Sequence, residues 1–226
     1  MDEFVSGLLA DNADHAERFD SRFDSVQDGQ LPSAVTVCCS DSRVLQDAMW
    51  GNTTPGRLFT CGNIGNRVIQ HTDDGAVVSG DVLYPIAHTG TETAIVVGHT
   101  GCGAVTAAYE ALTNGLDEPA GIEHSLGLLK PHLAPGVERL PTNLSREAAI
   151  NRLVEYNVDR QIEHLRHSDA IADSVTAVGV VYDFQDQYDG KRGELHVINI
   201  DGETDVATLR AAHPEDDARL RRLWDY

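Results

Sequence analysis

The chain has 226 residues, of which 41% are hydrophobic, so one sizeable core can form and a second domain is not required. Its 36 acidic residues outnumber the 17 basic ones, which gives a formal net charge of -19. Because so acidic a surface repels nucleic acid phosphates and anionic membranes, we expect neither as a partner. The low lysine content, Lys130 and Lys191 alone, indicates a protein of a salt-loving organism, in which counterions screen the self-repulsion.

The sequence carries no targeting signal that we recognise. The N-terminus is acidic, and no apolar run approaches the ~18 residues that cross a bilayer. The four cysteines, at positions 38, 39, 61 and 102, are too few for a disulfide scaffold in a chain of this length. We therefore expect a cytoplasmic protein with free thiols.

The first segment, residues 4–28, has apolar residues at helical spacing, with a break near Asp11 and Asn12. It predicts two helices that form an arm against a sheet or a second subunit. Residues 34–39 then form a short apolar, β-branched run, which is typical of a buried strand. Cys39 ends this strand, and Cys38 should face the opposite side as a small core residue.

A short helix around residues 45–49 and a second strand at residues 57–61 are predicted next. Residues 62–68 form a Gly/Asn loop that fails the spacing of a dinucleotide fingerprint. Cys61 is expected in the core, with a position near the site as the alternative. The pattern of residues 75–90 predicts a helix.

The clearest strand is residues 94–99, and the clearest following helix is residues 104–112. His99 then lies at a strand end and Cys102 at a helix start. Strands joined by helices predict a mostly parallel sheet, whose sites form at the carboxyl ends of strands. Cys39 and His99 are both expected at that edge.

The rest of the chain is predicted with less detail. Residues 114–144 are rich in glycine, proline and polar residues and indicate a loop with short helical pieces, whereas residues 145–167 predict a long helix. Residues 175–182 and 195–200 predict an edge hairpin of two strands. A charged helix over residues 205–224 is expected to close the chain.

Cys39, His99 and Cys102 together offer two thiolates and an imidazole, a donor set that suits tetrahedral zinc. Three protein ligands leave a fourth position for water, which is the arrangement of a catalytic zinc site. Other histidines, such as His88 and His132 along with His124, have no ligand spacing, although any of them could transfer protons. The glycines at positions 98, 101 and 103 give only a weak signal for a phosphate loop.

The run Cys39-x-Asp41-x-Arg43, followed by His99-x-x-Cys102-Gly103, resembles the signature of the β-class carbonic anhydrases. Further landmarks of that family occur in the same order: Pro55-Gly56-Arg57, Gly65-Asn66, Asn157-Val158-x-x-Gln161 and Gly179-x-Val181-Tyr182-Asp183. The resemblance implies an α/β fold with a mostly parallel central sheet flanked by helices, an N-terminal helical arm and an antiparallel edge strand. It implies a single domain over residues 1–226, in which residues 1–30 form a dimerisation arm, and a homodimer or a dimer of dimers.

The resemblance also implies a site. One Zn²⁺ per chain would be held by Cys39, His99 and Cys102, beside a dyad of Asp41 and Arg43. Zinc-bound hydroxide would attack carbon dioxide to give bicarbonate, with the backbone of Gly103 close to the substrate. Members of the family also have a closed form in which the aspartate becomes the fourth metal ligand. If Asp41 does the same, activity should fall at low pH.

Two departures from the family pattern stand out. Gly62 occupies the place of an arginine and Thr36 that of a tryptophan, so a regulatory bicarbonate site of the kind some members have is not supported. We also expect the mouth of the active site to differ in shape from that of the family, which bears on substrate preference. The alternatives are hydrolysis of carbon disulfide or carbonyl sulfide at the same zinc, and a non-catalytic zinc module whose site Asp41 closes.

Overall fold

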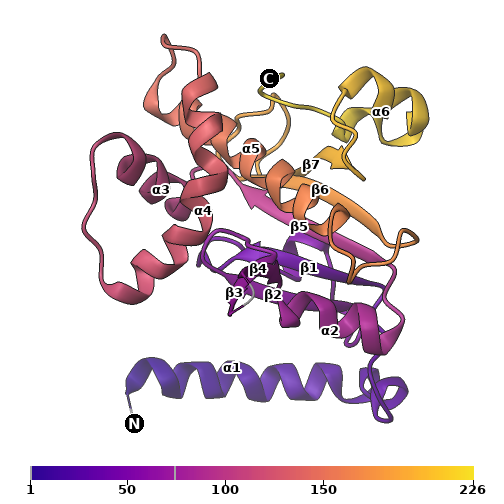
Figure 1. The fold of residues 1–226 in the computed structure, drawn as a ribbon. Helices are drawn as coiled ribbons and strands as arrows, with labels where there is room; N and C mark the ends of the chain where they lie inside the picture. The colour runs from indigo at the N-terminus through magenta and orange to yellow at the C-terminus, as the bar shows by residue number, and fades with distance from the viewer. Residues whose placement is uncertain (1, 74) are drawn as a thin grey trace.

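A five-stranded sheet forms the centre of the protein in the computed structural model, which describes residues 2–73 and 75–226 (Figure 1). Its strands are β1 (Ala34–Cys39), β2 (Leu58–Asn63), β5 (Thr93–His99), β6 (Thr176–Asp183) and β7 (Glu194–Ile200). Their spatial order is β2-β1-β5-β6-β7. The first four run parallel, and β7 pairs antiparallel with β6 at the edge. The predicted fold class and edge hairpin are therefore confirmed.

Helices cover one face of this sheet and build the main core. They are α2 (Gly80–Thr89), α3 (Gly103–Thr113), α4 (Ala120–Arg139) and α5 (Arg146–Arg166). The long helix α5 lies on β5 and β6, where two glycines allow close approach. A Cβ atom at Gly98 would lie 2.8 Å from Val154, and one at Gly179 would lie 2.7 Å from Val158. Helix α5 is thus fixed tightly against the strand that ends in His99.

The opposite face of the sheet has a smaller apolar cluster. Its fully buried members are Cys38, Val97 and Val180, with Met49 and Trp50 packed against them. Cys38 therefore faces away from Cys39, which belongs to the main core, as the alternation of side chains along a strand requires.

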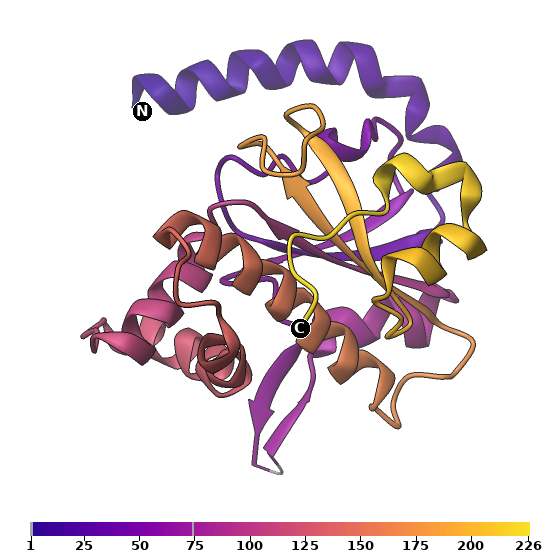
Figure 2. The ribbon, with the colours of Figure 1, turned by 90° about the horizontal axis from the view of Figure 1, so that it is seen from above.

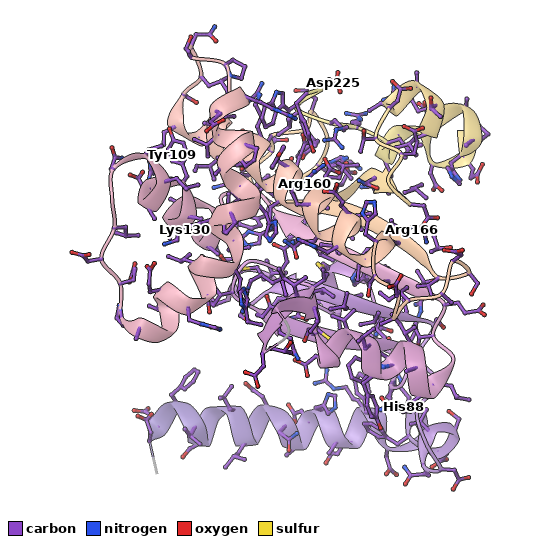
Figure 3. The ribbon with its side chains drawn as sticks, in the orientation of Figure 1. His88, Tyr109, Lys130, Arg160, Arg166 and Asp225 are labelled. Carbon is purple, nitrogen blue, oxygen red and sulfur yellow. The ribbon has the colours of Figure 1, made fainter. Side chains whose placement is uncertain are left out.

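The N-terminal arm is one helix, α1 (Glu3–Phe19), and the predicted break near Asp11 and Asn12 is wrong. Both residues are exposed, where their modest helix propensity costs little. Figures 1 and 2 show α1 lying beside the body, and Figure 3 shows its side chains standing clear along most of its length. None of its residues is buried.

Four other element predictions need correction. Residues 75–90 contain strand β4 (Gly75–Val78), paired with β3 (Ile69–Thr72), before α2 begins behind the Ser79 cap. Residues 114–144 hold the 20-residue helix α4 despite two internal prolines. The predicted terminal helix is only α6 (Val206–Ala212) and a 3₁₀ turn, because Pro214 cannot continue the helix. The short helix at 45–49 is a 3₁₀ turn, Ala48–Trp50.

Within the described residues, none of the helices combines the length and the apolar character that a bilayer crossing requires.

Candidate metal centre

Three potential ligands meet where β1 and β5 end. Cys39 is the last residue of β1 and His99 the last residue of β5, and the two strands are parallel neighbours. Gly101 then turns the chain in the left-handed region, at φ +61°, so that Cys102 caps the N-terminus of α3. Residues distant in sequence are brought together at the predicted edge of the sheet.

The donor atoms of Cys39, His99 and Cys102 all lie within 4.8 Å of one another, and the three residues are buried. The two sulfur atoms are 3.9 Å apart. Tetrahedral ligation at a Zn–S distance of ~2.3 Å requires a sulfur separation of about 3.8 Å. The spacing of this group therefore fits a metal ion.

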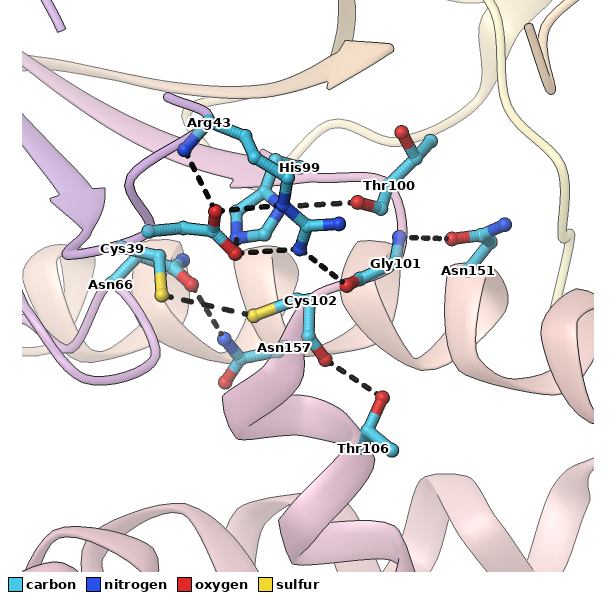
Figure 4. A network of polar contacts seen from close by, with 11 residues as sticks. Cys39, Arg43, Asn66, His99, Thr100, Gly101, Cys102, Thr106, Asn151 and Asn157 are labelled. Atoms are coloured by element: carbon cyan, nitrogen blue, oxygen red, sulfur yellow. Dashed lines mark hydrogen bonds and ion pairs between the residues drawn. The ribbon is translucent and has the colours of Figure 1, made fainter. Parts of the chain in front are cut away.

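The tautomer of His99 also fits. Its Nδ1 atom lies 3.0 Å from the carbonyl oxygen of Thr100, so this nitrogen carries the proton and donates (Figure 4). Its Nε2 atom is buried and has no hydrogen-bond partner. A lone pair buried without a partner is costly unless a ligand uses it, and neutral imidazole is a common metal ligand.

The two thiols interact directly. The Cys102 thiol donates to the sulfur of Cys39, which lowers the pKa of Cys39 to about 5, with a smaller contribution from the Gly65 amide and against burial, which raises it. The same interaction and burial raise the pKa of Cys102, against backbone amides of Val105 and Ala104 at the start of α3 that lower it. One thiolate is thus favoured at the pair, on Cys39, and metal binding would have to displace the proton of Cys102.

Asp41 and Arg43 form a two-pronged ion pair beside the donor group. Arg43 Nε donates to Asp41 Oδ1 at 2.8 Å, and Nη2 donates to Oδ2 at 2.7 Å (Figure 4). Arg43 Nη2 also donates to the carbonyl of Gly101 at 3.1 Å. These bonds hold the pKa of Asp41 well below its usual range. Asp41 Oδ2 is 3.7 Å from His99 Nε2, so the carboxylate lies next to the donor group while remaining bound to arginine.

Amide side chains of α5 fix the loops around the group. Asn157 donates to the carbonyl of Gly65 at 3.2 Å, and Gln161 accepts from the amide of Val68 at 2.9 Å. Asn151 accepts from the amide of Gly101 at 2.9 Å. Sequence reasoning identified Asn157 and Gln161 only as landmarks and missed Asn151. The feature that could have identified Asn151 is that it is a polar residue on the apolar face of the helix predicted over residues 145–167.

The remaining predicted residues are placed as follows. Gly103 is the first residue of α3, and a side chain there would meet no heavy atom within 4 Å, so space lies beside it. Cys61 lies in the main core, donates to the carbonyl of Asp81, and has its pKa raised to about 11 by burial. Among the described residues, the one cluster of three or more histidine, cysteine or acidic side chains spaced for a metal contains neither Cys61 nor another histidine.

Comparisons with known proteins agree with this geometry. The family model described as carbonic anhydrase matches residues 34–191. A carbonic anhydrase of Pseudomonas aeruginosa is 29% identical over 221 residues, which cover 95% of this chain and 94% of that protein. A β-carbonic anhydrase structure from Aspergillus fumigatus aligns with a TM-score of 0.71 at 25% identity, covering 98% of this chain and 100% of the other.

A tetrameric β-carbonic anhydrase from Sordaria macrospora shares the fold, with a TM-score of 0.70, 24% identity and coverage of 87% and 96% of the two chains. The family match spans more than half of the chain and includes all three donor residues together with Asp41 and Arg43. The chain therefore belongs to the carbonic anhydrase family of enzymes, in its β-class.

Proposed function

We propose that the protein catalyses the zinc-dependent, reversible hydration of carbon dioxide to bicarbonate and a proton. The observation that carries the proposal is the buried group of Cys39, His99 and Cys102 beside the Asp41–Arg43 pair, in a chain of the carbonic anhydrase family. Neither a structural zinc site nor a metal-storage role explains why an arginine holds the nearest carboxylate by two hydrogen bonds.

One Zn²⁺ per chain would be held by the two thiolates and the Nε2 atom of His99. Bound there, zinc would supply a Lewis acid that makes hydroxide available near neutral pH. The sulfur spacing and the unpartnered Nε2 atom support this assignment. Two thiolates and an imidazole favour zinc over the hard cations calcium and magnesium, which prefer oxygen ligands.

Asp41 would orient the attacking water by accepting a hydrogen bond from it. Arg43 keeps the carboxylate ionised and binds both of its oxygens, which would leave the fourth ligand position for water or substrate. A closed form, in which Asp41 itself occupies that position, would require the side-chain bonds from Arg43 to break. We propose that the paired arrangement is the active one.

Substrate would enter on the side of the dyad. The side chain of Arg43 is 49% exposed and that of Asp41 14%, whereas His99 is 1% exposed. Gly103 is exposed and has open space beside it, which would admit a molecule as small as carbon dioxide. The backbone amide of Gly103 would receive the developing bicarbonate oxygen, and its position in the first turn of α3, where helix N–H groups are unpaired, supports this role.

We propose a homodimer, or a dimer of dimers, joined through residues 1–30. Helix α1 exposes four large apolar side chains, Phe4, Val5, Leu8 and Leu9, which a second subunit would cover. We also propose a cytoplasmic location in a salt-loving organism. The four free thiols support a reducing compartment, and the net charge of -19 supports high salt.

The test is stopped-flow measurement of carbon dioxide hydration in molar KCl, on protein whose zinc content has been quantified. We expect one zinc per chain, with turnover that disappears, together with the metal, in Cys102→Ala. The matched control is Cys38→Ala, which removes a buried thiol from the opposite face of β1 and should retain both.

If the zinc-loaded protein does not hydrate carbon dioxide, the proposal is wrong. Turnover of carbon disulfide or carbonyl sulfide by the same preparation would then establish the alternative hydrolase. Zinc binding without turnover of any of these substrates would indicate a structural site.

A further inference from the structure

The loop after β6 carries a phenylalanine to the candidate site. Asp183, the last residue of β6, is 1% exposed, and its carboxylate accepts three backbone N–H bonds. The donors are Gln185 at 3.0 Å, Gln187 at 2.7 Å and Tyr188 at 2.9 Å. A buried carboxylate with three amide donors is a rigid anchor, so the position of Phe184 between Asp183 and Gln185 is fixed by the fold.

The ring of Phe184 contacts both a potential metal ligand and the dyad. The guanidinium carbon of Arg43 lies over this ring, 4.8 Å from its centroid. The ring also stacks on the imidazole of His99, with centroids 5.8 Å apart and planes inclined by 22°. Phe184 is itself half-buried and supported by Tyr182, whose ring centroid is 5.9 Å away.

These contacts restrain Arg43 in a direction that its hydrogen bonds leave free. The bonds from Arg43 to Asp41 and to the Gly101 carbonyl lie near the plane of the guanidinium and fix its edge. An aromatic face is negative and attracts a cation placed over it, so the ring of Phe184 resists movement of the Arg43 guanidinium out of that plane. Nearly half of the Arg43 side chain is exposed, so without the ring the pair would exchange more freely with water.

We propose that Phe184 is a positioning residue for carbon dioxide hydration, because its ring holds the Arg43 guanidinium in the plane that pairs with both oxygens of Asp41. This inference rests on the proposed function for its kinetic consequence, although not for the contact itself. The competing explanation is that Phe184 only fills space beside His99.

The kinetic test compares two substitutions of the zinc-loaded enzyme. Phe184→Leu keeps apolar volume but removes the ring, and we expect kcat/KM for carbon dioxide to fall about five-fold, with zinc content unchanged. Phe184→Tyr keeps the ring and should retain kcat/KM within about two-fold. Phe59→Leu is the matched control, since Phe59 is a partly buried phenylalanine on β2, paired with Val35 near the start of β1 rather than with the end of β1 that carries Cys39.

A double-mutant cycle separates positioning from space filling. In an Arg43→Lys background, where no planar guanidinium remains to be held, Phe184→Leu should change kcat/KM by less than about two-fold. An equal loss in both backgrounds would mean that the ring acts only by packing, and would overturn the inference. If Phe184→Leu proves unstable, Phe184→Met replaces it with a side chain of similar volume.

The contact is also measured without turnover. In the ¹H–¹⁵N spectrum, the Nε–H signal of Arg43, assigned by its loss in Arg43→Lys, should be displaced upfield by the ring and protected from solvent exchange. Phe184→Leu should move it downfield and speed its exchange, whereas Phe184→Tyr should not. An unchanged signal in Phe184→Leu would overturn the positioning role. If the wild-type protein shows no turnover of carbon dioxide, the proposed function fails, and this spectrum still decides whether Phe184 holds Arg43.

Discussion

At the scale of single residues, the candidate site depends on side chains that touch no ligand. The peptide of Gly101, which the side chain of Asn151 holds in place, is an example. Its amide donates to Asn151, and its carbonyl accepts from Arg43, so one peptide turn links α5 to the dyad. The carbonyl of Gly65 is held in the same manner by Asn157. Backbone N–H and C=O groups in the interior require hydrogen-bond partners, and these partners fix the geometry of the turn.

Replacing Asn151 with alanine should therefore loosen the dyad while leaving the ligands in place. The lost acceptor leaves the Gly101 amide without its partner, at a cost of roughly 1–3 kcal/mol in the free energy of unfolding. We expect lower hydration activity and unchanged zinc content, measured by urea denaturation, stopped flow and metal analysis. Asn143→Ala removes an exposed asparagine just before α5 and serves as the control. Equal stability of the two variants would contradict the prediction.

At the scale of elements, α5 connects the site to the C-terminal segment, which crosses it (Figure 2). Asp159 forms a buried ion pair with Arg222 at 2.7 Å and accepts from the hydroxyl of Tyr226 at 2.6 Å. Glu155 accepts from the hydroxyl of Tyr188 and the amide of Leu223, both at 2.7 Å. The last residues are thus fixed by carboxylates on the helix that also carries Asn151 and Asn157.

Glu155 should make stability depend on pH. Burial raises its pKa to about 7, against Arg222 and hydrogen bonds that lower it, with Asp159 also facing it. The folded protein therefore binds a proton that the unfolded chain releases at a lower pH. This contribution to stability is complete below the ordinary carboxyl pKa and is lost as the pH rises through about 7.

The measurement is urea unfolding from about pH 5 to pH 8 for wild type and Glu155→Gln. The wild type should lose stability relative to the variant as the pH rises, because the amide does not titrate and the other groups are common to both proteins. A constant difference between the two curves would show that Glu155 does not change its protonation over this range.

Sequence patterns predicted those elements whose apolar spacing is regular. Residues 94–99 and 145–167 are of this kind, and the placement of the metal donors was predicted because Cys39 and His99 end strands and Cys102 begins a helix. Helix α4 was missed because Pro131 and Pro135 signal a break that tertiary packing overrides. Its leucines Leu126, Leu129 and Leu133 are buried against the core. The contact between Phe184 and Arg43 was missed because it joins residues that no periodicity relates.

At the scale of the whole molecule, the net charge of -19 opposes the compact state through self-repulsion. We expect molar KCl to raise the melting temperature by about 5 °C or more, which corresponds to roughly 2 kcal/mol for a chain of this size. Glu215 and Asp216 are exposed residues of the acidic 3₁₀ turn. In a variant with Glu215→Gln and Asp216→Asn, KCl should raise the melting temperature by less than it does in the wild type. A melting temperature that is indifferent to KCl would count against adaptation to salt.

A second prediction at this scale concerns helix α1 of the N-terminal arm. Helix α1 has no buried residue, yet Phe4, Val5, Leu8 and Leu9 share one side of it, where exposure to water is unfavourable. An isolated helix of 17 residues is only marginally stable in water, so α1 needs a surface to cover this stripe. The proposed dimer supplies that surface as a second copy of the chain.

Leu8→Asp places a charge within the stripe, and Ala10→Asp places the same charge on the opposite side of the same helix. Sedimentation should show a smaller assembly for Leu8→Asp and the wild-type assembly for Ala10→Asp, each at matched concentration in molar KCl. Far-UV circular dichroism should also show loss of helix in Leu8→Asp alone, because a helix without its partner surface frays. If both variants sediment as the wild type does, the apolar stripe does not hold the subunits together, and residues 1–30 are not the dimerisation arm.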